Sequence, residues 1–182
     1  MINSKKRGNV MFWEYFIPAV ALFLVLIITA NLIMSFKYKK TLENIRMELL
    51  RLLPGSEVDI FDRDSVYQFS VKNDKEKIIV KLIMAQDDYE FIITNIDRWT
   101  VNSNPKQWTR KTKPIFIEGA EGFVNYSEAD NEIKKIVLIY PTSKRIIRYL
   151  NESDTVVVNT EDNVGGISFI KYNELEKFLK QE

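Results

Sequence analysis

The chain has 182 residues, a length typical of one compact domain with an appendage. It contains no cysteine and no histidine, which excludes a disulfide scaffold, cysteine or histidine metal ligands, and catalysis by Ser–His or Cys–His pairs. Lys and Arg number 26 against 25 Asp and Glu, and the resulting charge of +1 argues against a dedicated polyanion binder and against an acidic tail.

The first feature along the chain is an uncharged run of 22 residues between Glu14 and Lys37. A hydrocarbon core about 30 Å thick requires roughly 20 apolar residues in a helix. The run is longer than the apolar part of a cleaved signal peptide, about 7–15 residues, and basic residues follow it directly. We therefore expect a short basic tail over 1–14, a transmembrane helix over 15–36, and the lipid bilayer as a partner. The residues expected at the membrane interfaces are Trp13, Tyr15, Lys37, Tyr38, Lys39 and Lys40.

The basic residues on the two flanks predict the orientation of this helix. The N-terminal tail carries three of them and the C-terminal flank carries five: Lys5, Lys6 and Arg7, against Lys37, Lys39, Lys40, Arg46 and Arg51. The positive-inside rule favours a cytoplasmic position for the C-terminal domain. The reverse orientation would fit an extracytoplasmic component of an envelope or secretion assembly.

A juxtamembrane helix is expected over 37–55. Its apolar residues recur at 3-4-3 spacing, at Leu42, Ile45, Leu49 and Leu52, and Pro54-Gly55 ends the pattern. No helix breaker separates this segment from the apolar run, so one long helix is consistent with the sequence. We expect the stripe to pack on its own domain. A two-stranded coiled coil, and with it a homodimer, is the alternative, although only two heptads are present.

The remaining residues, 56–182, are expected to form one soluble α/β domain with a mixed sheet. Its first part predicts a three-strand antiparallel meander, because alternating or continuous apolar runs are separated by short polar turns. These runs are 67–71, 78–85 and 89–94.

Strand–helix–strand units are expected in the second part, where apolar runs suggest parallel pairing. The expected order is a helix at 120–126, a strand at 135–141, a helix at 143–150, strands at 155–159 and 167–170, and a final helix capped by Asn173.

This order of elements is similar to the core of restriction-endonuclease-like (PD-(D/E)XK) domains. The stretch IVLIYPTSKRIIRYLNESDTVVVNTEDNVGGISFIKYNELEKFL resembles the end of nuclease-related (NERD) domains, and the similarity covers residues 45–179. The resemblance implies a site in which an Asp and an acid-x-Lys pair hold a divalent cation and activate water. The third predicted strand has Glu90 but no Lys two positions later, and the chain's E-x-K, Glu132-Ile133-Lys134, precedes a later strand. The implied active site is therefore degenerate, and we assign no catalytic residue, metal ligand or cofactor.

One basic segment is interleaved with aromatic residues and contains no acid between Val101 and Lys113. Its members are Trp99, Lys106, Trp108, Arg110, Lys111 and Lys113. Cations for phosphates and aromatic rings for stacking suit single-stranded nucleic acid, and cations near a bilayer suit anionic lipid. A protein partner is another candidate, and a solvated loop whose tryptophans pack on the sheet is the structural alternative.

The sequence therefore predicts a single-pass membrane protein whose α/β domain is a non-catalytic binding module. A membrane-tethered nuclease-like enzyme and an extracytoplasmic assembly component are the alternatives.

Overall fold

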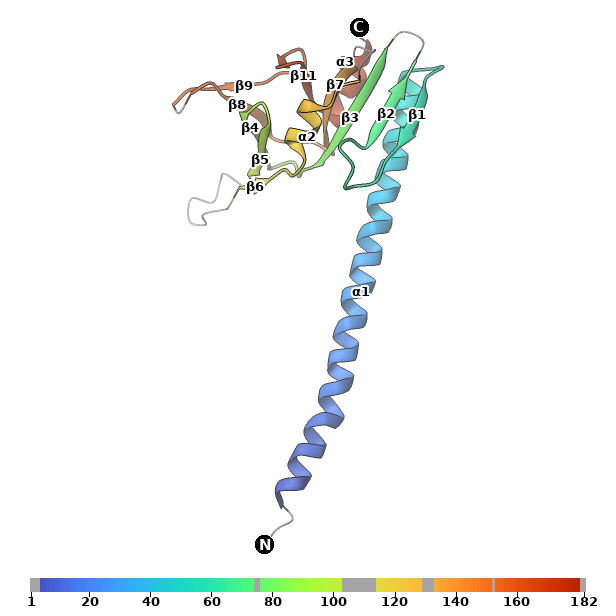
Figure 1. Ribbon diagram of the computed structural model, residues 1–182, viewed down its shortest axis with the longest axis vertical. Coiled ribbons are helices and arrows are strands. Elements are labelled where there is room, and N and C mark those ends of the chain that lie inside the picture. Colours follow the sequence, from blue (N-terminus) through green and yellow to red (C-terminus); the bar gives the residue numbers. More distant parts are fainter. Residues whose placement is uncertain (1–3, 74–75, 103–113, 129–132, 152, 181–182) are drawn as a thin grey trace. The chain divides into compact units, whose positions relative to one another are not determined.

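The computed structural model describes residues 4–73, 76–102, 114–128, 133–151 and 153–180, with side chains described from residue 15 onward. The chain divides into two units, Met1–Asn44 and Ile45–Glu182. The first unit is helical, and the second contains two β-sheets with short helices (Figure 1).

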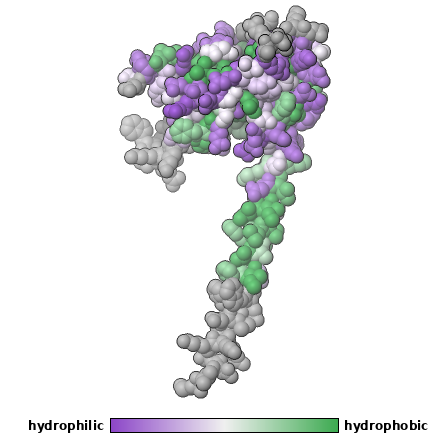
Figure 2. Space-filling view, viewed as in Figure 1, coloured by the Kyte–Doolittle hydropathy of each residue, from purple (hydrophilic) through white to green (hydrophobic). Residues whose placement is uncertain are grey.

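Helix α1 (Ser4–Leu52) is continuous, so the apolar run and the juxtamembrane segment belong to one helix. From Tyr15 onward it is long and apolar enough to cross a membrane, and its most apolar stretch has no buried side chain. Figure 2 shows this stretch as a hydrophobic surface. Pro18 lies inside the helix. In the last turns of α1, Ile45 and Leu49 are buried, which agrees with a stripe that packs on its own domain.

The first sheet, sheet A, has six strands in the order β1-β2-β3-β7-β11-β10. Its strands are β1 (Glu57–Ile60), β2 (Phe69–Lys72), β3 (Lys77–Met84), β7 (Ile133–Tyr140), β10 (Asn163–Val164) and β11 (Ile167–Lys171). The strands β1, β2 and β3 form an antiparallel meander, and β3, β7 and β11 are parallel to one another. The sheet is therefore mixed, as the sequence predicts.

The second sheet, sheet B, has five strands in the order β6-β5-β4-β8-β9. Its strands are β4 (Glu90–Asn95), β5 (Arg98–Asn102), β6 (Ile115–Phe116), β8 (Arg145–Tyr149) and β9 (Thr155–Val157). Only β4 and β8 are parallel, and the other neighbours are antiparallel.

The hydrophobic core lies between the two sheets and α2 (Ala120–Asn125). Alternate residues of β3 explain why its sequence is almost wholly apolar. Ile79 and Ile83 belong to this core, whereas Ile78, Val80 and Leu82 are buried on the opposite face. The chain ends with a 3₁₀ turn, η1 (Tyr172–Glu174), and helix α3 (Leu175–Lys180). Arg51 bonds Glu176 at 3.1 Å, so α3 lies beside the last turn of α1.

Three details of the predicted fold are wrong. The strand predicted at 89–94 forms β4 but leaves the meander for sheet B, and β1 takes its place in the meander. The helix predicted at 143–150 is strand β8, and β9 pairs with it antiparallel rather than with β7. At the C-terminus, Asn173 lies inside η1, and its Oδ1 accepts a hydrogen bond from the hydroxyl of Thr142 at 3.4 Å, so the predicted helix cap is also wrong.

Candidate interaction surface

The hairpin of β8 and β9 is formed by residues 145–157 and lies at one edge of sheet B. An Asn151 turn closes it: the Oδ1 of Asn151 accepts hydrogen bonds from the backbone N–H groups of Ser153 (2.9 Å) and Asp154 (2.7 Å). This local pattern is the reason why Asn favours turns. Figure 1 shows the hairpin extending from the body of the second unit.

Apolar side chains of this hairpin are exposed to solvent. Leu150 at its end is 61% exposed, and the edge strand contributes Val156 and Val157, which are 43% and 50% exposed. Tyr149 is exposed to a smaller extent. Scattered apolar residues are normal on a protein surface, but a group on one projecting element is typical of a contact surface.

A row of mostly apolar residues crosses one face of sheet B from one edge strand to the other. Its strand register aligns five residues in one row: Phe116, Thr100, Ile92, Ile147 and Val157. The three central residues of the row are buried, while the two at the edges, Phe116 and Val157, are exposed. The exposed ends of the row therefore lie on the two edge strands, β6 and β9.

An open pocket of about 860 Å³ lies where β4 and β8 end. It is lined by Ile93, Thr94, Asn95, Ile96, Asp97, Arg148, Tyr149, Leu150 and Asn151. The polar part of its lining includes the amide side chains of Asn95 and Asn151 and the charged side chains of Asp97 and Arg148, and apolar residues make up much of the rest.

An ion pair fixes the other end of β8 to β4. Glu90 is buried, and its Oε1 lies 2.5 Å from the Nε of Arg145 and 3.7 Å from the Nζ of Lys144. Because loss of Arg145 would leave the buried carboxylate of Glu90 without its nearest partner, this contact favours the observed register of the two strands.

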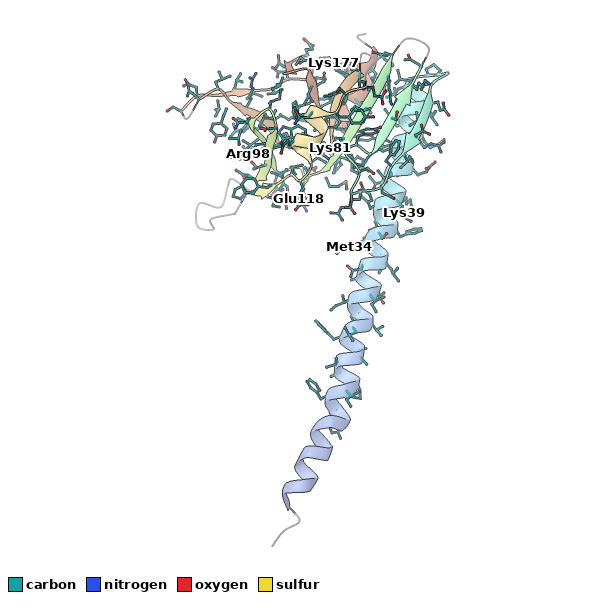
Figure 3. All side chains as sticks on the ribbon, in the orientation of Figure 1. Met34, Lys39, Lys81, Arg98, Glu118 and Lys177 are labelled. Atoms are coloured by element: carbon teal, nitrogen blue, oxygen red, sulfur yellow. The ribbon has the colours of Figure 1, made fainter. Side chains whose placement is uncertain are left out.

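A second candidate site surrounds Lys81 on β3. Its Nζ donates a hydrogen bond to the carbonyl of Val66 at 3.1 Å, and the residue is only 6% exposed. A Cβ atom on Gly119 would lie 3.3 Å from this Nζ, so a residue without a side chain leaves room for it. Burial lowers the pKa of Lys81. Figure 3 shows Lys81 between β3 and α2.

The loop between β1 and β2, which includes Arg63 and Val66, is held in place by Gln68. The amide Oε1 of Gln68 accepts a hydrogen bond from the backbone N–H of Leu82 at 2.9 Å, and its Nε2 donates to carbonyls of the loop, including that of Arg63 at 3.1 Å. The side chain thus replaces a backbone group in the β2–β3 ladder. This arrangement positions Val66, which accepts the hydrogen bond from Lys81.

A polar network adjoins this loop. The hydroxyls of Tyr67 and Tyr126 are 3.3 Å apart, Tyr126 donates to Glu128 at 2.7 Å, and Glu128 pairs with Lys77. The hydrogen bonds with Tyr67 and with Glu128 raise the pKa of Tyr126. The network joins the end of α2 to β3 and has a structural role.

The described residues do not bring the requirements of a nuclease site together on the meander. On β3, Ile79, two positions before Lys81, is an apolar core residue, so this strand contains no acid-x-Lys pair. Across the described part of the chain, no group of three or more acidic residues could hold a metal ion. Within the same residues, no carboxylate forms an ion pair with Lys81.

Trp99 is the one member of the predicted basic surface inside the described residues, and it follows the structural alternative, in which the tryptophan packs on the sheet and is not available to a ligand. It is 1% exposed and packs among the rings of Phe91, Phe123 and Phe169, while its indole N–H donates to the carbonyl of Ile96 at 2.8 Å. Trp99 therefore belongs to the core and has no face free for a ligand. The other members, Lys106, Trp108, Arg110, Lys111 and Lys113, lie outside the described residues.

The predicted interface residues all lie on α1. Of those with described side chains, Tyr15 is 71% exposed, Lys37, Lys39 and Lys40 are exposed, and Tyr38 is half-buried. Trp13 is helical, and its side chain lies outside the described part.

Sequence reasoning missed both Lys81 and the β9 edge. The available signals were a single charge inside the apolar run IIVKLIMA and an uncharged run of β-branched residues, TVVV.

Comparison of the chain with protein-family models, curated proteins and solved structures gives no match. The resemblance to nuclease-related domains stays a prediction.

Proposed function

We propose that this chain is a single-pass membrane protein whose α/β unit is a non-catalytic binding module at the membrane surface. The observation that carries the proposal is the continuity of α1. One helix contains both the uncharged run, whose described side chains are exposed, and the residues Ile45 and Leu49, which are buried in the α/β unit. An uncharged helix of 22 residues is about 33 Å long, enough to cross the hydrocarbon core.

The exposed apolar residues of sheet B support a binding role. They lie on the two edge strands and at the end of the hairpin: Ile115, Phe116, Tyr149, Leu150, Val156 and Val157. On the face that Figure 2 shows, many residues of the second unit are hydrophilic. Because exposed apolar residues gain stability when another surface covers them, they favour a protein partner.

The surroundings of Lys81 contain no acid–base couple within the described residues. Burial lowers its pKa, and no carboxylate in that part of the chain forms an ion pair with it. The nuclease-like enzyme is kept as the second candidate.

Alkaline carbonate extraction of membranes tests the anchor. We expect the full chain to stay in the membrane fraction and the double variant Leu24→Lys/Ile28→Lys to be released. Each central Lys costs about 2.5–3.5 kcal/mol on the insertion scale. Met47→Lys is the matched control, because Met47 is exposed on the same helix outside the uncharged run. Release of the unaltered chain would overturn the proposal.

A reporter at the C-terminus tests the orientation. The positive-inside rule predicts activity for a reporter that works only in the cytoplasm. Activity of a reporter that works only outside the cytoplasm would favour the envelope or secretion assembly.

A further inference from the structure

Strand β9 leaves one edge of sheet B open within the described residues. Natural edge strands are usually protected from further pairing by a very short length, a charge, a proline or a bulge. The edge strand here, Thr155-Val156-Val157, is short, but its three residues include no charge, proline or bulge, and all three are exposed. Its sequence and geometry therefore favour the addition of another strand.

The hydrogen bonds within the hairpin show which backbone groups are available. Leu150 N–H donates to Asp154 O, and Val158 N–H donates to Ile146 O, both at 2.9 Å. Because bonding directions alternate along an antiparallel strand, residues 154, 156 and 158 direct their groups toward β8. The N–H and C=O groups of Thr155 and Val157 consequently point to the open edge.

The open edge ends at Asn159. Its N–H, the next group in the outward series, already donates to the Oδ2 of Asp162 at 2.7 Å. Two N–H and two C=O groups, those of Thr155 and Val157, remain for pairing.

We propose that β9 pairs with β9 of a second copy of this chain, antiparallel and centred on Val156. In this register Thr155 of each copy faces Val157 of the other, and the two residues exchange both backbone hydrogen bonds. A two-fold arrangement thus satisfies all four outward groups of each strand with the same groups of its copy.

Two observations favour a second copy over another partner. The outward backbone groups of Thr155 and Val157 match each other in two-fold antiparallel order, and the three residues of the strand carry no charge that would repel the same strand of a copy. The inference also rests on the proposed function, since a membrane anchor confines copies to one plane and raises their effective concentration.

The pairing joins the two copies of sheet B edge to edge. The two-fold axis runs through the sheet, so the exposed Tyr149 and Val157 of both copies lie on the same side of the joined sheet. The shared strand is three residues long, and the contact therefore belongs to the small interfaces, below about 1,200 Å², that are typical of transient complexes. A contact of this size is populated only when the membrane anchor keeps the two copies close together.

Disulfide cross-linking of the full chain in proteoliposomes tests this register. The chain contains no cysteine, so a disulfide in Val156→Cys must join two copies through residue 156. Directly opposed residues of a non-hydrogen-bonded pair have Cα atoms about 4.5 Å apart, within the range that a disulfide spans. Phe116→Cys is the matched control, because Phe116 is exposed on the other edge strand of the same sheet. We expect Val156→Cys to dimerise at least about tenfold faster than Phe116→Cys, because pairing raises the effective concentration of the thiols.

A second substitution tests the hydrogen bonds. Val157→Pro removes an N–H that points to the open edge, and proline is tolerated at such positions. In the Val156→Cys background we expect Val157→Pro to reduce cross-linking to the Phe116→Cys rate, and Val157→Thr to retain it. Unchanged cross-linking with Val157→Pro, or equal rates for the two single cysteines, would overturn the proposal.

The same experiment in native membranes separates this inference from the proposed function. A disulfide between residue 156 and a different protein would show that β9 binds another partner and would overturn the pairing of two copies, whereas the proposed binding role would stand. Loss of the chain from carbonate-washed membranes would overturn the anchor, and with it the basis for pairing in the membrane.

Discussion

Replacement of Trp99 tests whether this residue belongs to the core or to a ligand-binding surface. Its ring is 1% exposed, and its centroid lies 5.3 Å from that of Phe169 and 6.1 Å from that of Phe123, both in edge-to-face geometry. Removal of a buried aromatic ring costs about 3–5 kcal/mol. Since domains are stable by about 5–15 kcal/mol, Trp99→Ala should remove a large part of the stability of this unit.

A more conservative change separates the ring from its polar group. Trp99→Phe keeps an aromatic ring but leaves the carbonyl of Ile96 without the indole N–H, which lies 2.8 Å away. We expect a loss of about 1–2 kcal/mol, the cost of an unmade buried hydrogen bond together with a small loss of volume.

Urea unfolding of the full chain in detergent micelles, followed by circular dichroism, measures both effects. Phe116→Ala is the control, because Phe116 is an aromatic residue of the same sheet that is 64% exposed, and surface changes usually alter stability by less than about 0.5 kcal/mol. Equal midpoints for Trp99→Ala and Phe116→Ala would refute the assignment of Trp99 to the core.

Two further predictions concern the turn before β11 and the buried lysine. Gly165 and Gly166 both have a positive φ, but only a Cβ on Gly165 would meet another side chain, at 1.8 Å from the Cδ1 of Ile96. The left-handed conformation costs about 1–2 kcal/mol in either Ala variant. In thermal unfolding, Gly165→Ala should lower the free energy of unfolding by about 1 kcal/mol more than Gly166→Ala, because Ile96 must leave its rotamer. Adding Ile96→Ala should remove the difference between the two glycine variants. Equal losses for the two glycine variants with Ile96 present would contradict the contact. Lys81→Met should stabilise the chain near neutral pH by about 1 kcal/mol or more, because a buried ammonium is replaced by an apolar group. Burial lowers the pKa of Lys81 below 10.5, so the unfolded state holds more protons in the window up to that value. The stability of the unaltered chain should therefore rise with pH there, and its difference from Lys81→Met should shrink. A constant difference in thermal unfolding between pH 7 and pH 10 would show that Lys81 does not titrate in this window.

The local sequence pattern was sufficient to predict the elements whose burial or exposure follows from a run of consecutive residues. The uncharged run of α1 is apolar on every side, so its helical length and its exposure follow from composition. The central strands β3 and β7 are apolar at successive positions because both of their faces are covered, and this pattern identified them as buried strands. The short helix α2 was also predicted at its observed position.

Tertiary pairing decided the elements for which local signals were ambiguous. The segment 143–150 has residues typical of helix ends at both termini, yet Ile146 and Ile147 are buried on opposite faces of a strand. That burial exists only because β4 lies beside β8 in parallel register, which is a contact between residues more than 50 positions apart. A single sequence contains no signal for such a partner.

The same reason explains the candidate surface. Trp99 is adjacent in sequence to a basic segment, but β5 directs Trp99 and Val101 into the core and Thr100 to the other face. The residues TVVV predict a strand, whereas their place at the open edge follows from the strand order of sheet B. The sequence by itself determined the helix that is suited to a membrane and the apolar strands of the domain. The tertiary structure decided which of those strands lies at a sheet edge among the described residues, because strand order depends on pairings that no local pattern encodes.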